Sequence, residues 1–375
     1  MFDIPRDVCF LNAAAWSPLP LATVEAGRKA VARKAQPWKI DARFAGEQHD
    51  RARRAAAALI NAAPDDVALI SSVAYGVATA AKALPVARGT RVLVLEEDHS
   101  SPVLEWTARA DAQGFTVETV RRPGDGDWTS AVLEAIERRG AAPVALASIS
   151  SVHWTDGIAL DMPCIAAALR ARGAALLVDA TQAVGAMPVD VGAFDPDFLV
   201  FPTYKWTLGP YGRAFLYIAR RRQEAVPLEQ TAFGRKGVAA ERLPYFADTS
   251  YVAGARRFDM GERDHFIGLE MASIGMELAA AWGTAAVAGR IKTVTDRLAE
   301  GLRNSGVLVA DDRFRCAHIL SLGFPKGVPE DLPQRLAAED VHVALRLGKL
   351  RVSPHVYNDN EDADRFLEVF LKHVN

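Results

Sequence analysis

The chain has 375 residues, of which 50% are hydrophobic and 24% are charged. This length and composition suit one large and one smaller domain, each with its own core, and exclude a largely disordered chain. Forty-four basic and forty-six acidic residues give a formal net charge of −2. Such a balance offers no general attraction to a polyanion, so we expect no nucleic acid partner.

The cysteines and the N-terminal residues indicate the compartment. Cys9, Cys164 and Cys316 have no paired spacing, so neither a disulfide framework nor a metal site is indicated, and a reducing environment is favoured. The first residues, MFDIPRDVCF, lack a basic region followed by an apolar core, and no stretch approaches about 18 continuous apolar residues. We therefore expect a cytoplasmic protein without a membrane partner.

Residues 17 to about 255 alternate strand-like and helix-like segments. Short apolar runs predict buried strands, and Ala- and Arg-rich stretches such as DRARRAAAALINAA and MPCIAAALRARG have helical periodicity. This alternation predicts an α/β fold with a mainly parallel sheet. A helix-forming stretch from Phe266 to Asn304, a β-rich part and the amphipathic ending EDADRFLEVFLKHV predict a small domain after about residue 260. The predicted strands are RVLVLEED, PVALASIS, AALLVDA and FLVFP.

Lys205 and Asp179 are the strongest candidates for chemistry. Lys205 follows a predicted strand in FLVFPTYKWTLGP, where its amine can lose solvation and become a nucleophile. Asp179 ends the run ALLVD, at the carboxyl edge where open α/β sheets bind ligands. A solvated strand-end lysine and a helix-capping aspartate are the ordinary alternatives. Together, the two residues match the needs of pyridoxal 5'-phosphate: an amine for the Schiff base and an acid beside the pyridine nitrogen.

A strand-to-helix turn in ISSVAYGVATAAKAL is a candidate phosphate site. The first backbone N–H groups of a helix lack intrahelical acceptors and coincide with the positive end of its dipole. Val73, Ala74 and Tyr75 would supply these donors, with Ser72 beside them. Because many helices begin after small polar residues, this motif alone is weakly specific.

Several segments, in order along nearly the whole chain, resemble the class V aminotransferase family of fold-type I pyridoxal-phosphate enzymes. That family includes cysteine desulfurases, kynureninases and isopenicillin N epimerase-like proteins. The segments are FLNAAAWSPLP, EEDHSSPVLEW, VDATQAVGAMPVDV, PTYKWTLGPYG, GARRFDMGERD and LRVSPHVYN. The resemblance implies a large domain with a mainly parallel seven-stranded sheet over residues 15–258. It also implies a small α+β domain made by residues 1–14 and 259–375, and a homodimer.

The resemblance also implies roles for side chains around the cofactor. His99 would stack on the ring and handle protons, which makes it catalytic together with Lys205 and Asp179. Gln182 would hydrogen-bond the phenolic oxygen of the ring. Thr181 would face the underside of the ring or cap a helix, and the hydroxyl groups of Thr203 and Tyr204 would reach the phosphate.

Arg351 and Trp154 are the substrate-binding candidates. Arg351 lies in the segment that the resemblance implies for the α-carboxylate, and a planar guanidinium suits a carboxylate. Trp154 would shape an apolar substrate pocket or simply pack in the core. The secondary candidates for phosphate or substrate contacts are Arg256, Arg257 and Arg263.

The reaction is less defined than the cofactor. Desulfurases carry a nucleophilic cysteine before the carboxylate-binding arginine, whereas RLAAEDVHVALRLGKLR has none. We therefore expect an aminotransferase-like enzyme acting on an amino acid or related amine. Elimination at a C–S or β position and epimerisation are the alternatives. A pyridoxal-phosphate-binding protein without activity is a further one. A nucleotide-binding α/β protein is disfavoured, because no glycine-rich fingerprint follows an early strand.

Overall fold

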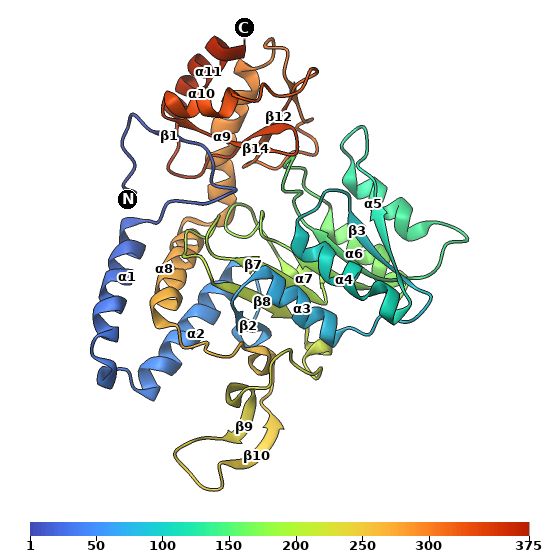
Figure 1. Cartoon of the computed structure of the whole chain (residues 1–375), viewed down its shortest axis with the longest axis vertical. Coiled ribbons are helices and arrows are strands. Elements are labelled where there is room, and N and C mark those ends of the chain that lie inside the picture. Colours follow the sequence, from blue (N-terminus) through green and yellow to red (C-terminus); the bar gives the residue numbers. More distant parts are fainter. Residues whose placement is uncertain (375) are drawn as a thin grey trace.

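A seven-stranded sheet is the centre of the computed structural model, which describes residues 1–374 (Figure 1). The strand order is β2-β8-β7-β6-β5-β3-β4. Pairing is parallel from β4 through β3, β5 and β6 to β7, and β8 runs antiparallel to both its neighbours. The strands are β2 (Val67–Ile70), β3 (Arg91–Leu95), β4 (Thr116–Val120), β5 (Val144–Ser150), β6 (Ala175–Asp179), β7 (Phe198–Pro202) and β8 (Ala214–Ile218). The predicted α/β fold with a mainly parallel sheet is confirmed.

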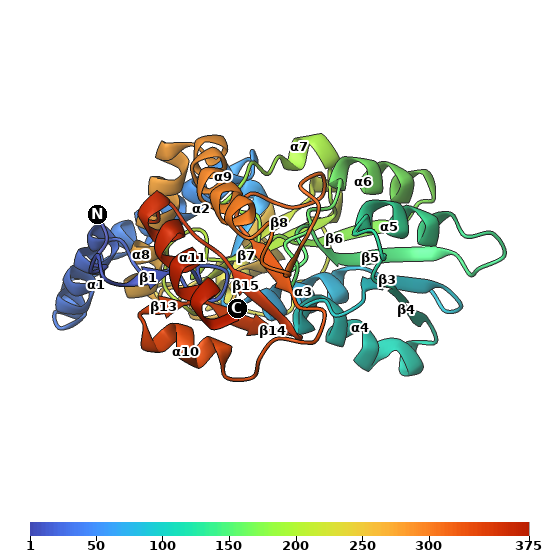
Figure 2. The same cartoon turned by 90° about the horizontal axis from the view of Figure 1, so that it is seen from above.

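Helices cover both faces of this sheet, as its continuous apolar strands require. Every residue of β3, β6 and β7 is buried. In Figure 2, α6 and α7 lie on one side of the strands and α4 lies on the other. The helices of this part are α1 (Leu21–Lys34), α2 (Ala42–Leu59), α3 (Val73–Ala83), α4 (Ser100–Gln113), α5 (Trp128–Glu137), α6 (Met162–Ala171) and α7 (Val191–Phe194).

The helix-forming stretch predicted from Phe266 to Asn304 folds as two helices, α8 (Phe266–Trp282) and α9 (Thr284–Gly301). Gly283 separates them with a φ of 79°, a left-handed conformation that favours glycine, and the two axes differ by 80°. No single helix within residues 1–374 is long and apolar enough to cross a bilayer, although this bent pair together has the length and composition.

The C-terminal part has its own small sheet and core. The four strands β11, β12, β15 and β14 are adjacent in that order, and β1 pairs in parallel with β13. The side chains of Cys9 and Leu11 pack with α9 and with the buried stripe of α11, which includes Phe366 and Phe370. The elements are β1 (Cys9–Phe10), β11 (Leu308–Val309), β12 (Leu320–Gly323), α10 (Leu332–Ala338), β13 (Val341–His342), β14 (Ala344–Arg346), β15 (Lys349–Val352) and α11 (Asn360–Val374).

We propose the domain division 15–258 against 1–14 with 259–375 on the basis of this shared core. The helix α8 connects the two parts, because its buried Leu269 and Met276 belong to the core of the large sheet. A two-stranded arm, β9 (Arg235–Val238) and β10 (Phe246–Tyr251), projects from the opposite end of the molecule (Figure 1).

A buried ion pair fastens α2 to the segment GARRFDMGERD, which contains the junction of the two proposed domains. The side chains of Arg53 and Asp259 are both fully buried and paired. Asp259 also accepts a hydrogen bond from the backbone N–H of Leu69 at 2.9 Å, and Arg53 donates to the carbonyl oxygen of Val67. One carboxylate therefore ties β2, α2 and the junction together.

We predict that Asp259→Asn lowers the free energy of unfolding by about 3–5 kcal/mol, because it leaves the Arg53 guanidinium buried without a counter-charge. Urea unfolding followed by circular dichroism measures the change. The matched control is Glu277→Gln, which breaks the partly exposed pair with Arg51. This control should cost less than about 1 kcal/mol, because solvent screens the pair. Equal losses in the two variants would contradict the assignment.

Candidate active site

The carboxyl ends of β6 and β7 bring the two main candidates together. Asp179 is the last residue of β6 and pairs in register with Val200 of β7, and Lys205 follows three residues after β7 ends. Because these strands are parallel neighbours, both side chains lie at the edge of the sheet where α/β folds bind ligands. The predicted proximity of Lys205 and Asp179 thus follows from the strand order.

The amine of Lys205 is buried and forms no ion pair within residues 1–374. The residue is 7% exposed, and no carboxylate of residues 1–374 lies within ion-pair distance of its amine. Burial lowers the pKa of Lys205 to about 7; the Arg351 guanidinium adds to this shift and Asp179 opposes it. A substantial fraction of the amine is therefore neutral near pH 7, which a nucleophile or general base requires.

Asp179 is held by its own turn. Its Oδ1 accepts a hydrogen bond from the backbone N–H of Thr181 at 2.9 Å, and the residue is 3% exposed. The hydroxyl group of Thr181 is buried and lacks a partner within residues 1–374. That hydroxyl is therefore free for a ligand. The Asp179 carboxylate caps only this local turn, and not a helix as in the alternative interpretation.

Gln182 is fixed by the N-terminal segment and by the residue after the lysine. Its Oε1 accepts a hydrogen bond from the Trp206 indole at 2.8 Å, and its Nε2 donates to the carbonyl oxygen of Ala14 at 3.2 Å. One N–H of the amide remains for the predicted contact with the phenolic oxygen. The two hydrogen bonds set the orientation of the amide before any ligand binds.

His99, Trp154 and Arg351 form a second wall beside the lysine. The His99 ring meets the Trp154 ring edge-on, with the centroids 5.8 Å apart. Burial lowers the pKa of His99, an effect that Asp179 opposes and Lys205 reinforces. Arg351 donates to the carbonyl oxygen of Trp154 at 2.8 Å, and its guanidinium carbon lies 6.0 Å from the Trp154 ring centroid. The residues predicted from three distant segments thus lie together.

Arg351 is buried without a negative partner. It is 1% exposed, its Nε makes no hydrogen bond, and it forms no ion pair within residues 1–374. Burial lowers the pKa of Arg351 to about 9, with Arg346 contributing. A buried cation without a counter-ion is costly, so this guanidinium is ready for an anionic ligand.

Two residues with predicted cofactor contacts, Tyr75 and Thr203, use the same polar groups in local hydrogen bonds. The backbone N–H of Tyr75 donates to the hydroxyl oxygen of Ser72 at 3.1 Å, which leaves Val73 and Ala74 as free donors at the start of α3. The Thr203 hydroxyl is fully buried and donates within the lysine loop, to the carbonyl oxygen of Pro210 at 2.6 Å. This hydrogen bond closes the loop, and the contact of Thr203 with the phosphate remains a prediction.

The three secondary arginine candidates are already paired with carboxylates of this chain. Each ion pair spans about the length of a hydrogen bond, between 2.6 and 3.1 Å. Arg256, Arg257 and Arg263 pair with Asp65, Glu224 and Asp259, respectively. We infer structural roles for all three.

An aromatic rim that the sequence did not single out lies beside the lysine. The rings of Trp16 and Tyr211 stack at 5.0 Å and contact Tyr204, whose centroid lies 5.4 Å from the Lys205 amine. Trp16 is 59% exposed and Tyr211 64% exposed. Burial raises the pKa of Tyr204 to about 12, with Tyr211 and Asp179 contributing. The phenol of Tyr204 therefore stays protonated, and its phosphate contact remains a prediction.

Asp98 is a further residue that the sequence reading missed. Its carboxylate accepts hydrogen bonds from the Ser150 hydroxyl at 2.6 Å and from the His99 backbone N–H at 2.7 Å. Burial raises the pKa of Asp98 to about 7, and the charge of Asp179 adds to the shift. Its position at a strand end, directly before His99, was the available signal.

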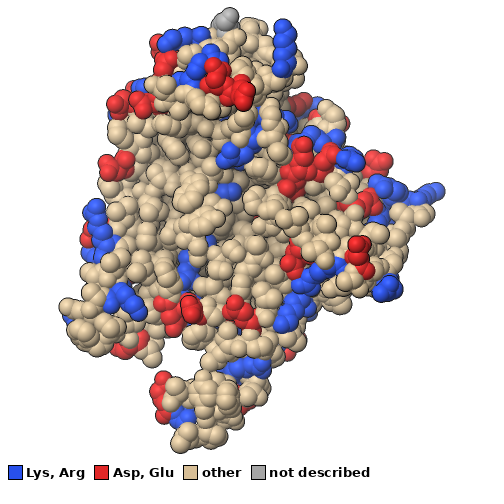
Figure 3. Space-filling view, viewed as in Figure 1, with Lys and Arg blue, Asp and Glu red and all other residues tan. Residues whose placement is uncertain are grey.

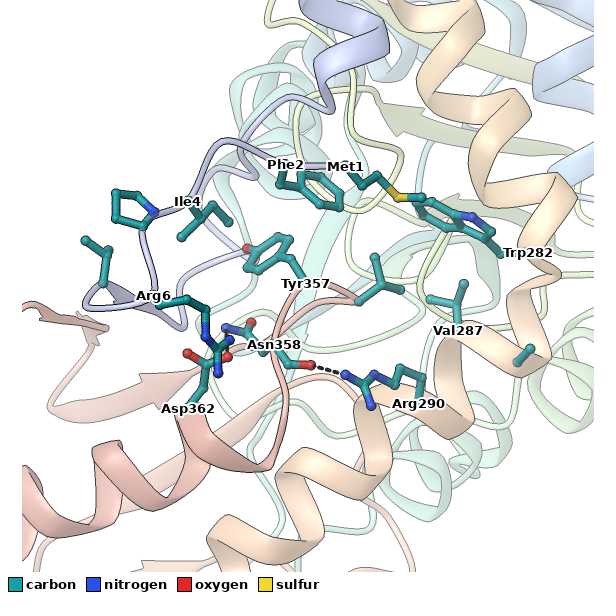
Figure 4. A pocket seen from close by; sticks show the side chains of 14 residues that line it. Met1, Phe2, Ile4, Arg6, Trp282, Val287, Arg290, Tyr357, Asn358 and Asp362 are labelled. Carbon is teal, nitrogen blue, oxygen red and sulfur yellow. Dashed lines mark hydrogen bonds between the residues drawn. The ribbon is translucent and has the colours of Figure 1, made fainter.

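A separate pocket of about 500 Å³ lies outside this site (Figure 4). Met1, Phe2 and Trp282 line one part of it, and Arg290 donates to the carbonyl oxygen of Asn358 at 2.9 Å on the other side. None of the predicted site residues lines this pocket, so it is not the cofactor site.

We predict that the reactivity of the Lys205 amine rises with pH and levels off above about pH 8. Competitive acetylation of the cofactor-free protein, with N-acetyl-lysine as internal standard, measures this reactivity. The reason is that a pKa of about 7 leaves the amine neutral there. Arg351→Gln should move the midpoint to higher pH, because it removes a nearby positive charge. Reactivity that still climbs in parallel with the standard at pH 9 would contradict the burial argument.

The combined donor set fits pyridoxal phosphate. Lys205 offers an amine for covalent attachment and Asp179 an acid for the pyridine nitrogen. The unpartnered Thr181 hydroxyl and the free backbone donors of Val73 and Ala74 suit the ring and the phosphate. Within residues 1–374, no three His, Cys, Asp or Glu side chains come together in a way that could hold a metal ion.

Comparison with known proteins gives the family. The family model described as "Aminotransferase class-V" matches residues 9–366. An uncharacterized aminotransferase, YcbU, of Bacillus subtilis (strain 168) is 28% identical over 84% of this chain and 81% of its own length. A probable cysteine desulfurase of Pyrococcus abyssi (strain GE5 / Orsay) is 25% identical over 87% of this chain and 83% of its own.

Solved structures show the same fold at lower identity. The cystine C-S lyase C-DES, in complex with its product cysteine persulfide, has a TM-score of 0.87 at 20% identity and covers 98% of both chains. The apo cysteine desulfurase of Thermococcus onnurineus NA1 has a TM-score of 0.84 at 21% identity, over 98% of this chain and 95% of its own. The chain therefore belongs to the aminotransferase class-V family of fold-type I enzymes, and its cofactor is pyridoxal phosphate.

Proposed function

We propose that this class V enzyme transfers the amino group of an amino acid or related amine, as an aminotransferase does. The observation that carries the proposal is the buried Lys205 amine, with its pKa lowered to about 7, beside Asp179 and the unpaired Arg351. An amine that is neutral near pH 7 can both bond to a carbonyl carbon and move a proton.

Each side chain of the site has a role that follows from its charge. Pyridoxal phosphate, when bound, supplies an electron-withdrawing ring that stabilises negative charge developing at the substrate Cα. Asp179 would keep the ring nitrogen protonated, and His99 would cover one face of the ring. Arg351 would hold the α-carboxylate by two parallel hydrogen bonds. The neutral Nζ of Lys205 would then take the proton from Cα and hold it as an ammonium group.

The cysteines support transfer over persulfide chemistry by a protein thiol. Burial raises the pKa of Cys9 and of Cys316 to about 12, so neither side chain supplies a thiolate near neutral pH. Cys164 is exposed in the first turn of α6, and its hydrogen bond with Asp161 raises its pKa. A C–S lyase that needs no protein thiol is the second candidate, favoured by the likeness to C-DES.

The test is a panel of amino acids offered to the purified holoenzyme with a 2-oxo acid acceptor, while keto acid, ammonia, sulfide and racemisation are followed together. We expect keto acid that depends on the acceptor, without ammonia or sulfide. Lys205→Ala should abolish it. Release of ammonia or sulfide would indicate elimination in place of transfer. Racemisation alone would indicate epimerisation. A holoenzyme that binds amino acids but makes no product would be a binding protein.

We further propose that the protein acts as a homodimer, the commonest soluble assembly. The projecting β9–β10 arm supports this, because Leu243 is 93% and Phe246 65% exposed there.

Charged side chains of both signs are interspersed on the face shown in Figure 3, and this favours no polyanion as the partner. We place the dimer in the cytoplasm, which cell fractionation tests.

We predict that Leu243→Asp shifts the protein towards monomers in sedimentation velocity runs, because the substitution puts a charge into an apolar contact. The control is Leu104→Asp, at an exposed leucine of α4 that lies outside the arm and is 59% exposed. This control should leave the dimer intact. A wild-type protein that sediments as an active monomer at micromolar concentration would refute the proposal.

A further inference from the structure

Three cationic side chains share one face of the β14–β15 hairpin. The antiparallel register pairs Ala344 with Arg351 and Arg346 with Lys349. Cross-strand partners lie on the same face of a sheet, and residues two apart on a strand also share a face. Arg346, Lys349 and Arg351 therefore lie on one face, and Leu345 and Leu350 lie on the other.

None of these three cations forms an ion pair within residues 1–374. Arg351 is buried, and Arg346 and Lys349 are half-buried. Arg351 donates only to the backbone of Trp154, and Arg346 only to the carbonyl oxygen of its neighbour Leu345 at 2.8 Å. The buried arginines Arg53 and Arg91 are paired with the carboxylates of Asp259 and Glu118, whereas the buried Arg213 forms no ion pair within residues 1–374.

Arg346 acts on Arg351, and both arginines act on the candidate catalytic lysine. Burial lowers the pKa of Arg346, and Arg346 in turn lowers the pKa values of Arg351 and Lys205. Burial also lowers the pKa of Lys349; Arg122 adds to this shift, and the carboxylates of Asp156 and Glu97 oppose it. Two neighbouring guanidinium groups carry two positive charges, and one carboxylate supplies only one negative charge. A single α-carboxylate on Arg351 would leave Arg346 uncompensated.

We propose that the substrate carries a second anionic group on its side chain and that Arg346 is the residue that selects it. The inference rests on the proposed function, in which Arg351 takes the α-carboxylate. Arg346 binds the distal carboxylate, phosphate or sulfonate, with Lys349 on the same face adding positive charge. Arg346 is then a specificity determinant that does not touch the reacting atoms.

The test compares matched amino acids that differ by one charge. Dissociation constants of glutamate and glutamine, of aspartate and asparagine, and of phosphoserine and serine are measured on the holoenzyme by calorimetry. The wild-type protein should bind at least one acidic member about tenfold or more tightly than its neutral partner. Arg346→Gln should remove most of this preference and leave the affinity for the neutral partner within about twofold. Arg346→Lys should restore part of it, because a point charge cannot reproduce a forked contact.

Two controls separate folding and surface charge from recognition. Arg303→Gln removes an arginine that is 70% exposed at the end of α9 and should leave every constant unchanged. Cofactor content and circular dichroism should be the same in all variants. A wild-type protein that prefers no acidic substrate would overturn the proposal. So would an Arg346→Gln variant that loses acidic and neutral substrates equally, because both guanidinium groups would then hold the α-carboxylate.

The result also distinguishes this inference from the proposed function. If neutral amino acids bind and turn over but acidic ones gain nothing, the assignment of Arg346 fails and the function stands. If the holoenzyme binds none of the six amino acids, the proposed function fails as well.

Discussion

The site depends on a lysine amine that is buried beside cations with no carboxylate in ion-pair contact. Lys205 is 7% exposed, and Arg351 and Arg346 both disfavour its charged form. Asp179 is the one group that favours the ammonium, and its Oδ1 is engaged by the backbone of Thr181. A protein that keeps positive charges unpaired around an amine forgoes stability there. Such a site is suited to anionic ligands and to an amine that reacts near neutral pH.

Segments far apart in the sequence hold this arrangement. The N-terminal segment anchors Gln182 through the carbonyl oxygen of Ala14, and Ser17 donates its backbone N–H to the carbonyl oxygen of Tyr204 at 3.1 Å. The small sheet contributes Arg351 through the β14–β15 hairpin, and the loop after β5 contributes Trp154. A shift of the C-terminal part against the large sheet would therefore move Arg351 relative to Lys205. Substrate binding and the packing of the two parts are linked in this way.

Much of this could be predicted from the sequence, because strand ends in a parallel sheet meet at one edge. That rule was enough to predict that Lys205 and Asp179 lie at the same edge of the sheet. Local hydrogen bonds are less visible in a sequence. A helix cap uses the backbone N–H of Tyr75 and a loop closure uses the hydroxyl of Thr203, and neither could be predicted from the residue types alone. The cationic face around Arg346 required the hairpin register, which only the turn geometry sets.

The most direct measurement of the central claim is to reduce the purified holoenzyme with borohydride, digest it and locate the cofactor by mass spectrometry. The account predicts one modified peptide, which spans the segment PTYKWTLGP and carries pyridoxal phosphate on Lys205. Lys205→Ala should yield no modified peptide although the fold is retained. Attachment to another lysine, or a modified peptide in that variant, would contradict the account.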